Sequence, residues 1–408
     1  MTTTTTADRR THLRSGRRTP HVMLATIALA MGGFAIGTTE FVTMGLLPEM
    51  ARGVGVSIPA AGHVISAYAL GVVVGAPLIA VFGARLPRRG LLLALMTAFA
   101  LGNAGSALAL NYESLTIARF LSGVPHGAFF GVASLVAASM VAPHRKGRAV
   151  SLVMLGLPVA NVVGVPTATW MGQHLGWRSA YWAVALLGLL TVALVLAFVP
   201  STPANPDATG RKELQAFARP QVWLTLLVGA IGFGGMFSMY SYIAPTITDV
   251  TELSASTVPL FLLAFGVGGV LGTVVGGHLA DWSIFRSLIA SSVTMGLALA
   301  LFTVTAHQAI AALLTVLLVA AVGSVLVVNL QMRLMQVAGD AQTLGAAMNH
   351  ASLNAANALG AWLGGLVIAS GYGYTAPSWV GVVLSAGGLL VLGISAVLHR
   401  RTQSRPSR

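Results

Sequence analysis

The chain of 408 residues contains no cysteine, and only 8% of its residues are charged. Without cysteine it can form no disulfide framework and offers no thiolate for chemistry. A soluble domain carries about 25% charged residues, so this sequence has too little charge to cover a water-facing surface. Hydrophobic residues make up 56% of the chain. The composition therefore indicates a membrane protein.

Motifs of the common enzyme classes are also missing. The sequence has no G-x-x-x-x-G-K-[ST] phosphate-binding loop and no H-E-x-x-H zinc motif, and no predicted loop is long enough for a nucleotide-binding domain. We therefore expect no enzymatic activity, no metal ion and no cofactor. The energy for any transport must come from an ion gradient or from the gradient of the substrate.

Apolar stretches recur along the chain at a spacing that predicts twelve transmembrane helices. A membrane-crossing helix needs about 20 apolar residues, and 408 divided by twelve leaves 34 residues per crossing, one helix and a short loop. The predicted spans are 22–47, 60–84, 90–110, 114–142, 149–172, 179–199, 222–247, 257–280, 287–306, 308–332, 344–370 and 377–398. This pattern predicts an all-α integral membrane protein.

The basic residues are distributed unequally between the predicted loops. With the N-terminus inside the cell, 20 of the 23 Lys and Arg fall on the cytoplasmic side, Arg52 and Arg178 fall outside, and Arg119 lies within a span. An excess of Lys and Arg marks cytoplasmic loops. The distribution predicts that both termini are cytoplasmic, and it explains the net charge of +13 without nucleic-acid binding.

Arginine pairs precede the first apolar run and resemble a twin-arginine export signal. The pairs are Arg9-Arg10 and Arg17-Arg18. The run that follows has about 26 residues, lacks a convincing cleavage site and is followed by eleven more spans. We therefore interpret it as the first transmembrane helix.

An internal repeat and a Pro- and charge-rich loop divide the chain into two halves. At an offset of 197, Gly71 matches Gly268 and Gly75 matches Gly272. We predict a disordered basic cytoplasmic tail at 1–20, six-helix bundles at 21–200 and 220–398, a cytoplasmic linker at 201–219 and a basic cytoplasmic tail at 399–408. Two such repeats around a central site are the architecture that alternating access requires.

Four segments carry family-like motifs. They are Gly37-Thr38-Thr39-Glu40-Phe41, then Gly75 followed by Arg85-Leu86-Pro87-Arg88-Arg89, then Arg119-x-x-x-Gly123-x-x-x-Gly127, and Gly156-x-Pro158 followed by Gly164-x-Pro166. Together they resemble the major facilitator superfamily in its twelve-span drug:proton antiporter branch. The first segment is similar to chloramphenicol-resistance and arabinose or sugar-efflux permeases. The resemblance implies a fold of two six-helix repeats and export of a small molecule in exchange for protons.

The resemblance also implies gating roles. In the superfamily signature G-x-L-A-D-R-x-G-R-K, the first copy has Ala84 at the Asp position and Pro87 at the Gly position, whereas the second copy keeps Asp281. This weakens the gating role of Arg85, Arg88 and Arg89 and shifts it towards Asp281 and Arg286. The segment with Gly156, Pro158, Gly164 and Pro166 is expected to pack closely and to hinge, with plain helix packing as the alternative.

Glu40 is the only acidic residue that lies well within a predicted span, and Arg119 is the only basic one. A charge at the bilayer centre costs about 2.5–3.5 kcal/mol even on the lenient insertion scale, so each should face a cavity and have a partner. A rise of 1.5 Å per residue places both roughly 8–10 Å below the outer surface. We predict that they pair and that a proton and the substrate compete for Glu40. A fixed structural ion pair is the alternative.

Other polar and aromatic residues complete the predicted site. His126 lies within about 20° of the helix face of Arg119 and is either a second protonatable site or a packing residue; His63 and His350 are weaker candidates. The predicted substrate-binding residues are Phe233, Phe237, Tyr240, Asn161, Asn329, Asn354 and Asn357. They suit a neutral or cationic lipophilic molecule, and helix packing or lipid contact is the alternative for the aromatic residues.

These features predict a monomeric exporter in the bacterial inner membrane that exchanges protons for a drug, an antibiotic such as chloramphenicol, or a sugar-like metabolite. Its expected partners are the small-molecule substrate, protons and the lipid bilayer. The alternatives are a proton-independent facilitator, an importer, or a receptor with a transporter-like fold. A single carboxylate without a cage of oxygen ligands favours protons over sodium.

Overall fold

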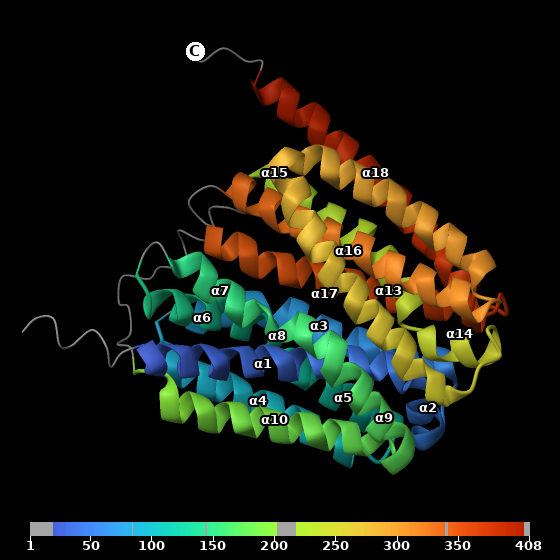
Figure 1. Ribbon diagram of the computed structural model, residues 1–408, viewed down its shortest axis with the longest axis horizontal. Coiled ribbons are helices and arrows are strands. Elements are labelled where there is room, and N and C mark those ends of the chain that lie inside the picture. Colours follow the sequence, from blue (N-terminus) through green and yellow to red (C-terminus); the bar gives the residue numbers. More distant parts are fainter. Residues whose placement is uncertain (1–18, 84, 143–144, 202–217, 339–341, 404–408) are drawn as a thin grey trace, which may run out of the picture.

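The computed structural model describes residues 19–83, 85–142, 145–201, 218–338 and 342–403, and within these ranges it contains helices and no strands. The predicted tail at 1–20 and linker at 201–219 lie almost entirely outside these residues. Figure 1 shows α1 and α3 beside α17 in the middle of the bundle, with α4 and α10 along one edge and α15 and α18 along the other. The prediction of an all-α fold is confirmed.

The first half consists of α1 (Thr19–Gly45), α2 (Leu47–Val54), α3 (Ile58–Gly83), α4 (Arg88–Leu108), α5 (Tyr112–Gly123), α6 (His126–Ser139), α7 (Lys146–Met154), α8 (Gly156–Val159), the π-helix η2 (Ala160–Gly164), α9 (Val165–Leu175) and α10 (Trp177–Phe198). The second half consists of α12 (Pro220–Leu227), the π-helix η4 (Val228–Gly232), α13 (Gly234–Tyr240), α14 (Ile243–Asp249), the 3₁₀-helix η5 (Ala255–Thr257), α15 (Val258–Thr305), α16 (Ala309–Ala338), α17 (Gln342–Ala369) and α18 (Ala376–Gln403). Helix α18 thus extends five residues into the segment predicted as a tail.

Eleven helical segments of the described chain are long and apolar enough to cross a membrane, against the twelve spans predicted. The difference arises at α15, in which the backbone leaves helical geometry at Ser283 (φ −170°, ψ 107°). A straight helix of 48 residues would be about 72 Å long, more than twice the bilayer core. The Ser287 hydroxyl donates to the Leu279 carbonyl across this bend. Helix α15 therefore contains the two predicted spans 257–280 and 287–306, and the twelve-helix fold is confirmed.

Proline residues interrupt several spans. Pro166 is the second residue after the π-helix η2, and Pro125 separates α5 from α6. Proline has no backbone N–H and its ring clashes with the carbonyl four residues earlier, and such sites favour π-helical turns and kinks. The bent spans bring short helical pieces, rather than long rods, to the middle of the molecule.

The two halves pack their helices with the same glycine contacts. A Cβ atom on any of four glycines of α3 or α15 would overlap a backbone carbonyl oxygen of the neighbouring span. The contacted carbonyls belong to Phe120 for Gly71, Val124 for Gly75, Leu317 for Gly268 and Ala321 for Gly272. The contacted residues keep the offset of 197 found for the glycines themselves (317 − 120 and 321 − 124). The helix pairs α3–α5 and α15–α16 are therefore equivalent, as an internal repeat requires.

This close approach predicts different effects for two glycines of α15. Gly272→Ala should lower the Tm of the detergent-solubilised protein, because the new methyl group collides with backbone that cannot move alone. Gly277→Ala is the matched control, since a Cβ there meets no atom within 4 Å and alanine favours helix over glycine by about 1 kcal/mol. Equal Tm values for the two variants would contradict the close-packing interpretation.

The halves also pack against each other at one end. We call the end that carries Arg85, Arg88, Arg145 and Arg286 the basic end. Towards the opposite end, every residue of 35–47 and of 232–247 is buried, so the later part of α1 and the segment from α13 into α14 are covered on all sides. This places Glu40 and the aromatic residues of α13 in the interior between the halves.

Candidate functional site

Arg119 on α5 is completely buried and is held by the first half of the chain. Its guanidinium donates to the Thr39 hydroxyl (2.9 Å) and to the Thr39 carbonyl (3.2 Å) on α1. The charge also lies 4.3 Å from the ring centre of Tyr68 and 5.3 Å from that of Tyr181, distances that favour cation–π attraction. The Thr39 hydroxyl in turn donates to Asn103. Arg119 is thus a permanent positive charge fixed within the membrane-spanning region.

Glu40 lies beside this cation without a direct ion pair. Its side chain is 5% exposed, and it is close enough to Arg119 for electrostatic attraction. Among the described residues, Glu40 and Arg119 have no N–O contact within 4.0 Å. Successive residues of a helix point about 100° apart, so Glu40 cannot share the face on which Thr39 contacts Arg119. From the sequence we predicted that Glu40 and Arg119 pair; in the structure they are neighbours, and Thr39 makes the direct contact with Arg119.

Asn357 of α17 faces the Glu40 carboxylate from the second half of the chain. It is 1% exposed, and neither its amide nitrogen nor its amide oxygen has a hydrogen-bond partner within the described structure. Burying a polar group without a partner is unfavourable. Asn357 is therefore available to bind Glu40 or a ligand.

The other predicted asparagines have different surroundings. Asn329 donates to the carbonyls of Val325 and Gly276 and so ties α16 to α15, and Asn354 donates to the His350 carbonyl within α17. Asn161 is half-buried in η2, with its backbone against Gly266. The structure brings Asn357 alone, of the four, directly to Glu40.

Five aromatic side chains form a buried cluster between the halves. Phe233, Phe237 and Tyr240 were predicted from their spacing, and the structure adds Phe41 and Phe265. The Phe41 ring centre lies 6.3 Å from that of Phe237 and 6.1 Å from that of Tyr240. Tyr240 stacks on Phe265 at 3.7 Å. Since Phe41 follows Glu40 directly, the aromatic cluster and the carboxylate are adjacent parts of one site.

His126 on α6 is fully buried and lies seven residues after Arg119 in the chain. Its Nδ1 atom lies 3.1 Å from the Tyr68 hydroxyl, and its Nε2 atom has no hydrogen-bond partner among the described groups. Its ring centre lies 6.2 Å from that of His350 on α17. His63 instead bonds the Tyr112 hydroxyl at an exposed position. Tyr68 and His350 therefore belong to the surroundings of the predicted site.

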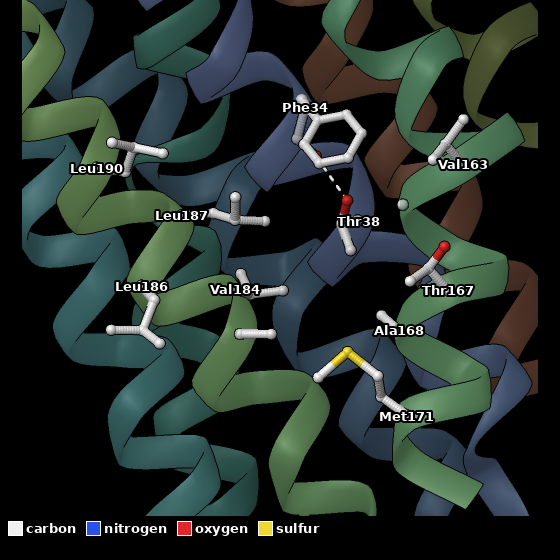
Figure 2. A pocket seen from close by; sticks show the side chains of 12 residues that line it. Phe34, Thr38, Val163, Thr167, Ala168, Met171, Val184, Leu186, Leu187 and Leu190 are labelled. Atoms are coloured by element: carbon white, nitrogen blue, oxygen red, sulfur yellow. Dashed lines mark hydrogen bonds between the residues drawn. The ribbon is translucent and has the colours of Figure 1, made fainter.

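A separate cavity of about 520 Å³ lies between α1, η2, α9 and α10. Figure 2 shows that aliphatic side chains line it together with Phe34, Met171, Thr167 and Thr38. The Thr38 hydroxyl donates to the Phe34 carbonyl in its own helix. Val163 and Leu186 on its rim are 53% and 63% exposed. This cavity is open to the side of the bundle and lacks charged residues, so it differs in chemistry from the Glu40 site.

A model of the Major Facilitator Superfamily matches residues 29–349. The chain belongs to this superfamily.

Known relatives agree with this assignment. The inner membrane transport protein YdhP of Escherichia coli K12 is 41% identical over 91% of this chain and 95% of its own length. The chloramphenicol resistance protein of Streptomyces lividans is 33% identical over 89% and 94%. A crystal structure of a D-xylose-proton symporter superposes with a TM-score of 0.72 at 16% identity, covering 91% and 97% of the two chains. The protein is a multi-pass membrane transporter of small substrates and not an enzyme.

The signature residues of the superfamily lie at the basic end. Arg89 on α4 donates to the Leu196 carbonyl in the last turn of α10, so it links two helices of the first half. Asp281 and Arg286 are exposed and, in the described part of the chain, form no ion pair with each other. Arg286 instead lies 5.5 Å from the Trp282 ring centre. An inside-closing salt bridge at these positions stays a prediction.

The remaining signature residues have simpler surroundings. Arg85 is exposed and Arg88 half-buried. Gly156 packs against the backbone of Ala30 and Phe34, and Gly164 packs against Thr38 and Phe34. These contacts pack Gly156 and Gly164 closely along α1, whereas a gating or hinge role of the Gly156–Pro166 segment stays a prediction.

The role of Thr39 leads to a stability prediction. Thr39→Val should destabilise the protein by about 1–3 kcal/mol, because it leaves a buried guanidinium N–H and the Asn103 carbonyl oxygen without their partner. Thr38→Val is the matched control, since the Thr38 hydroxyl bonds only a carbonyl of its own helix. Thermal unfolding in detergent should give a lower Tm for Thr39→Val alone, and the same Tm for both variants would argue against the assigned role of Thr39.

Proposed function

We propose that this protein exports a small organic molecule from the cytoplasm of a bacterium in exchange for protons, by alternating access. Glu40 is the residue for which proton and substrate compete. The observation that carries this proposal is a buried carboxylate between the two halves, beside a fixed guanidinium that does not pair with it directly. An ionisable group at this depth is a functional site by default.

The indirect contact between Glu40 and Arg119 suits a proton carrier. Removing one partner of a close buried ion pair strands the other charge at a cost of about 3–5 kcal/mol. Here the guanidinium is held by Thr39 and two tyrosine rings whether or not Glu40 is charged. Glu40 can therefore gain and lose a proton without losing a direct salt bridge and without releasing Arg119.

The aromatic cluster and Asn357 favour a neutral or cationic lipophilic substrate. Aromatic faces attract cations and flat apolar groups, and the amide of Asn357 beside Glu40 can both donate and accept hydrogen bonds. The relative named a chloramphenicol resistance protein supports an antibiotic as one substrate class. A substrate that binds between Phe41 and Asn357 would contact Glu40, which explains how it displaces the proton.

The proposal includes an orientation. Both termini lie in the cytoplasm, because 20 of the 23 Lys and Arg fall on that side of the predicted topology. The basic end is then the cytoplasmic end. The name of the relative YdhP as an inner membrane transport protein supports the same membrane for this chain, and a monomer is expected.

Proton coupling is tested by Glu40→Gln. A growth-inhibition panel that includes chloramphenicol, in a host without its own pumps, first identifies a transported compound. Adding that compound to detergent-solubilised protein with a pH indicator should release protons from the parent protein and none from Glu40→Gln. Glu49→Gln is the control, because Glu49 lies outside the span in α2 and pairs with Arg52 at 3.5 Å, so it should keep the release.

The alternatives give different outcomes. Undiminished proton release from Glu40→Gln contradicts the role of Glu40. A proton-independent facilitator moves the compound but releases no protons in the parent protein. A transporter-like receptor gives equal drug levels in cells with and without the protein.

Substrate binding by the aromatic cluster is tested with two buried phenylalanines. Phe237→Ala should weaken the Kd for the identified compound about tenfold, since one aromatic contact plus its buried area exceeds 1 kcal/mol. Phe302→Ala is the control, because Phe302 is equally buried in the second half but does not belong to the aromatic cluster. Both variants should lose stability, and equal Kd values would identify the aromatic residues as packing alone.

A further inference from the structure

Two histidines from opposite halves meet in the interior, apart from Glu40. His126 on α6 and His350 on α17 have ring centres 6.2 Å apart. Phe130, one turn after His126, stacks on His350 at 5.1 Å with an angle of 2° between the rings. We call His126 and His350 the histidine pair. It is a contact between the two repeats that is made of titratable groups.

The histidine pair is connected to the cation of the candidate site. The Arg119 guanidinium lies over the Tyr68 ring at 4.3 Å, and the Tyr68 hydroxyl is 3.1 Å from Nδ1 of His126. Because Nε2 of His126 is buried without a hydrogen-bond partner in the described structure, one ring nitrogen is fixed by Tyr68 and the other is unengaged. In neutral imidazole one nitrogen donates and the other accepts, so this ring has room for one more proton.

The pair lies between Glu40 and the basic end. His126 is seven residues beyond Arg119, which is about 10 Å further along the span at 1.5 Å per residue. Helix α17 begins at the basic end with Gln342, and His350 is eight residues, or about 12 Å, into it. A proton that travels from Glu40 towards the basic end therefore passes the level of the histidine pair.

We propose that His126 and His350 form a second proton-accepting site, which holds the proton after Glu40 has released it and whose protonation separates the two repeats at the basic end. This inference rests on the proposed function of Glu40 as the first proton site. The step moves one proton: the carboxylic acid of Glu40 becomes a carboxylate, and an imidazole of the pair becomes an imidazolium. No other bond forms or breaks.

Electrostatics gives this order of events. While Glu40 is protonated, no negative charge offsets Arg119. A second cation at the histidine pair, on the other side of Tyr68, is then unfavourable. When Glu40 loses its proton, its negative charge offsets Arg119, and the imidazolium becomes acceptable. The two sites are therefore occupied alternately rather than together.

The contact between the repeats depends on the pair being neutral. Uncharged imidazole rings can pack on each other and on Phe130, whereas a buried imidazolium needs water or an opposite charge. On the described side chains, the ionisable groups that face the pair are Tyr68 of α3, Arg119 of α5 and, beyond it, Glu40 of α1. Helices α4 and α16 contribute Arg89 and Arg333, which are bonded to the Leu196 carbonyl and to Gln221 instead. A protonated histidine of the pair therefore has no adjacent carboxylate to offset its charge and attracts water instead. The entry of water between the rings separates α6 from α17.

The absence of native cysteine allows a direct distance measurement. Leu86→Cys in the first half and Trp282→Cys in the second place two exposed nitroxide labels at the basic end. Electron-electron distance distributions are recorded in detergent between about pH 8 and pH 4, a range that extends below the ordinary titration of histidine because burial disfavours an imidazolium. The expected result is a shift to longer distances as the pH falls. Labels at Arg52→Cys and Ser370→Cys report the opposite end, where no such lengthening is expected.

Variants of the pair decide between this proposal and simple packing. His350→Phe keeps an aromatic ring against Phe130, and His350→Gln gives a second, uncharged replacement. Both should remove the pH-dependent shift while keeping the Tm close to that of the labelled parent. His278→Gln is the matched control, because His278 is exposed near the basic end and bonds only Val274 of its own helix. A pH-dependent shift that persists in both His350 variants overturns the proposal.

A Glu40→Gln background separates this inference from the proposed function. There the Arg119 charge is never offset, so the distance change should require a pH at least one unit lower. If the midpoint pH of the distance change is the same as in the parent protein, the histidine pair is not linked to Glu40. That result overturns the proposed order of proton transfer from Glu40 to the pair. If substrate-driven proton release instead survives Glu40→Gln, the function proposed for Glu40 is wrong. The distance measurements on the His350 variants then still decide whether the histidine pair causes the pH-dependent shift.

Discussion

The structure depends on one buried cation that cannot lose its charge. A guanidinium stays protonated at any pH the protein meets, so Arg119 must be stabilised within the bundle at all times. Its partners Thr39, Tyr68 and Tyr181 all belong to the first half of the chain. Because they are neutral, they orient the charge without cancelling it. Arg119 therefore produces a constant positive potential in the interior, and this potential determines which neighbouring groups can be charged at the same moment.

The two repeats share their packing but not their chemistry. The glycine contacts of α3 with α5 recur in α15 with α16 at the offset of 197, so each half has the same close helix pair as a rigid unit. The same offset places Phe237 opposite Glu40, Val316 opposite Arg119 and Gly323 opposite His126. The first half thus contains Glu40, Arg119 and His126, whereas the second half contributes Asn357, His350 and most of the aromatic rings. Substrate and proton meet where the halves touch, which is also where relative movement of the halves changes access.

Hydropathy predicted the spans, because the bilayer requires long apolar helices. The constant rise of a helix also led us to expect Glu40 and Arg119 at similar depth. Hydropathy and helix rise could not predict which side chains meet between spans. The rise gives depth but not the rotation of one helix against another, so the bonds from Arg119 to Thr39 were missed. In the sequence, Phe41, Phe265 and Tyr68 cannot be distinguished from other residues of the spans. One signal was present: Phe265 lies 197 residues after Tyr68, so the two occupy equivalent positions of the repeat. His350 becomes informative only when α17 is placed against α6.

Three consecutive residues of α1 explain how binding at this site could move the repeats. Thr39 contacts Arg119, Glu40 faces Asn357, and Phe41 packs on Phe237 and Tyr240. With about 100° between successive side chains, a single turn of α1 touches the cation of its own half and both the amide and the aromatic rings of the other half. A small rotation or tilt of α1 changes all three contacts together. A substrate that alters the fit of Phe41 therefore alters the surroundings of Glu40 as well, which couples the two ligands through one helix even when they do not touch.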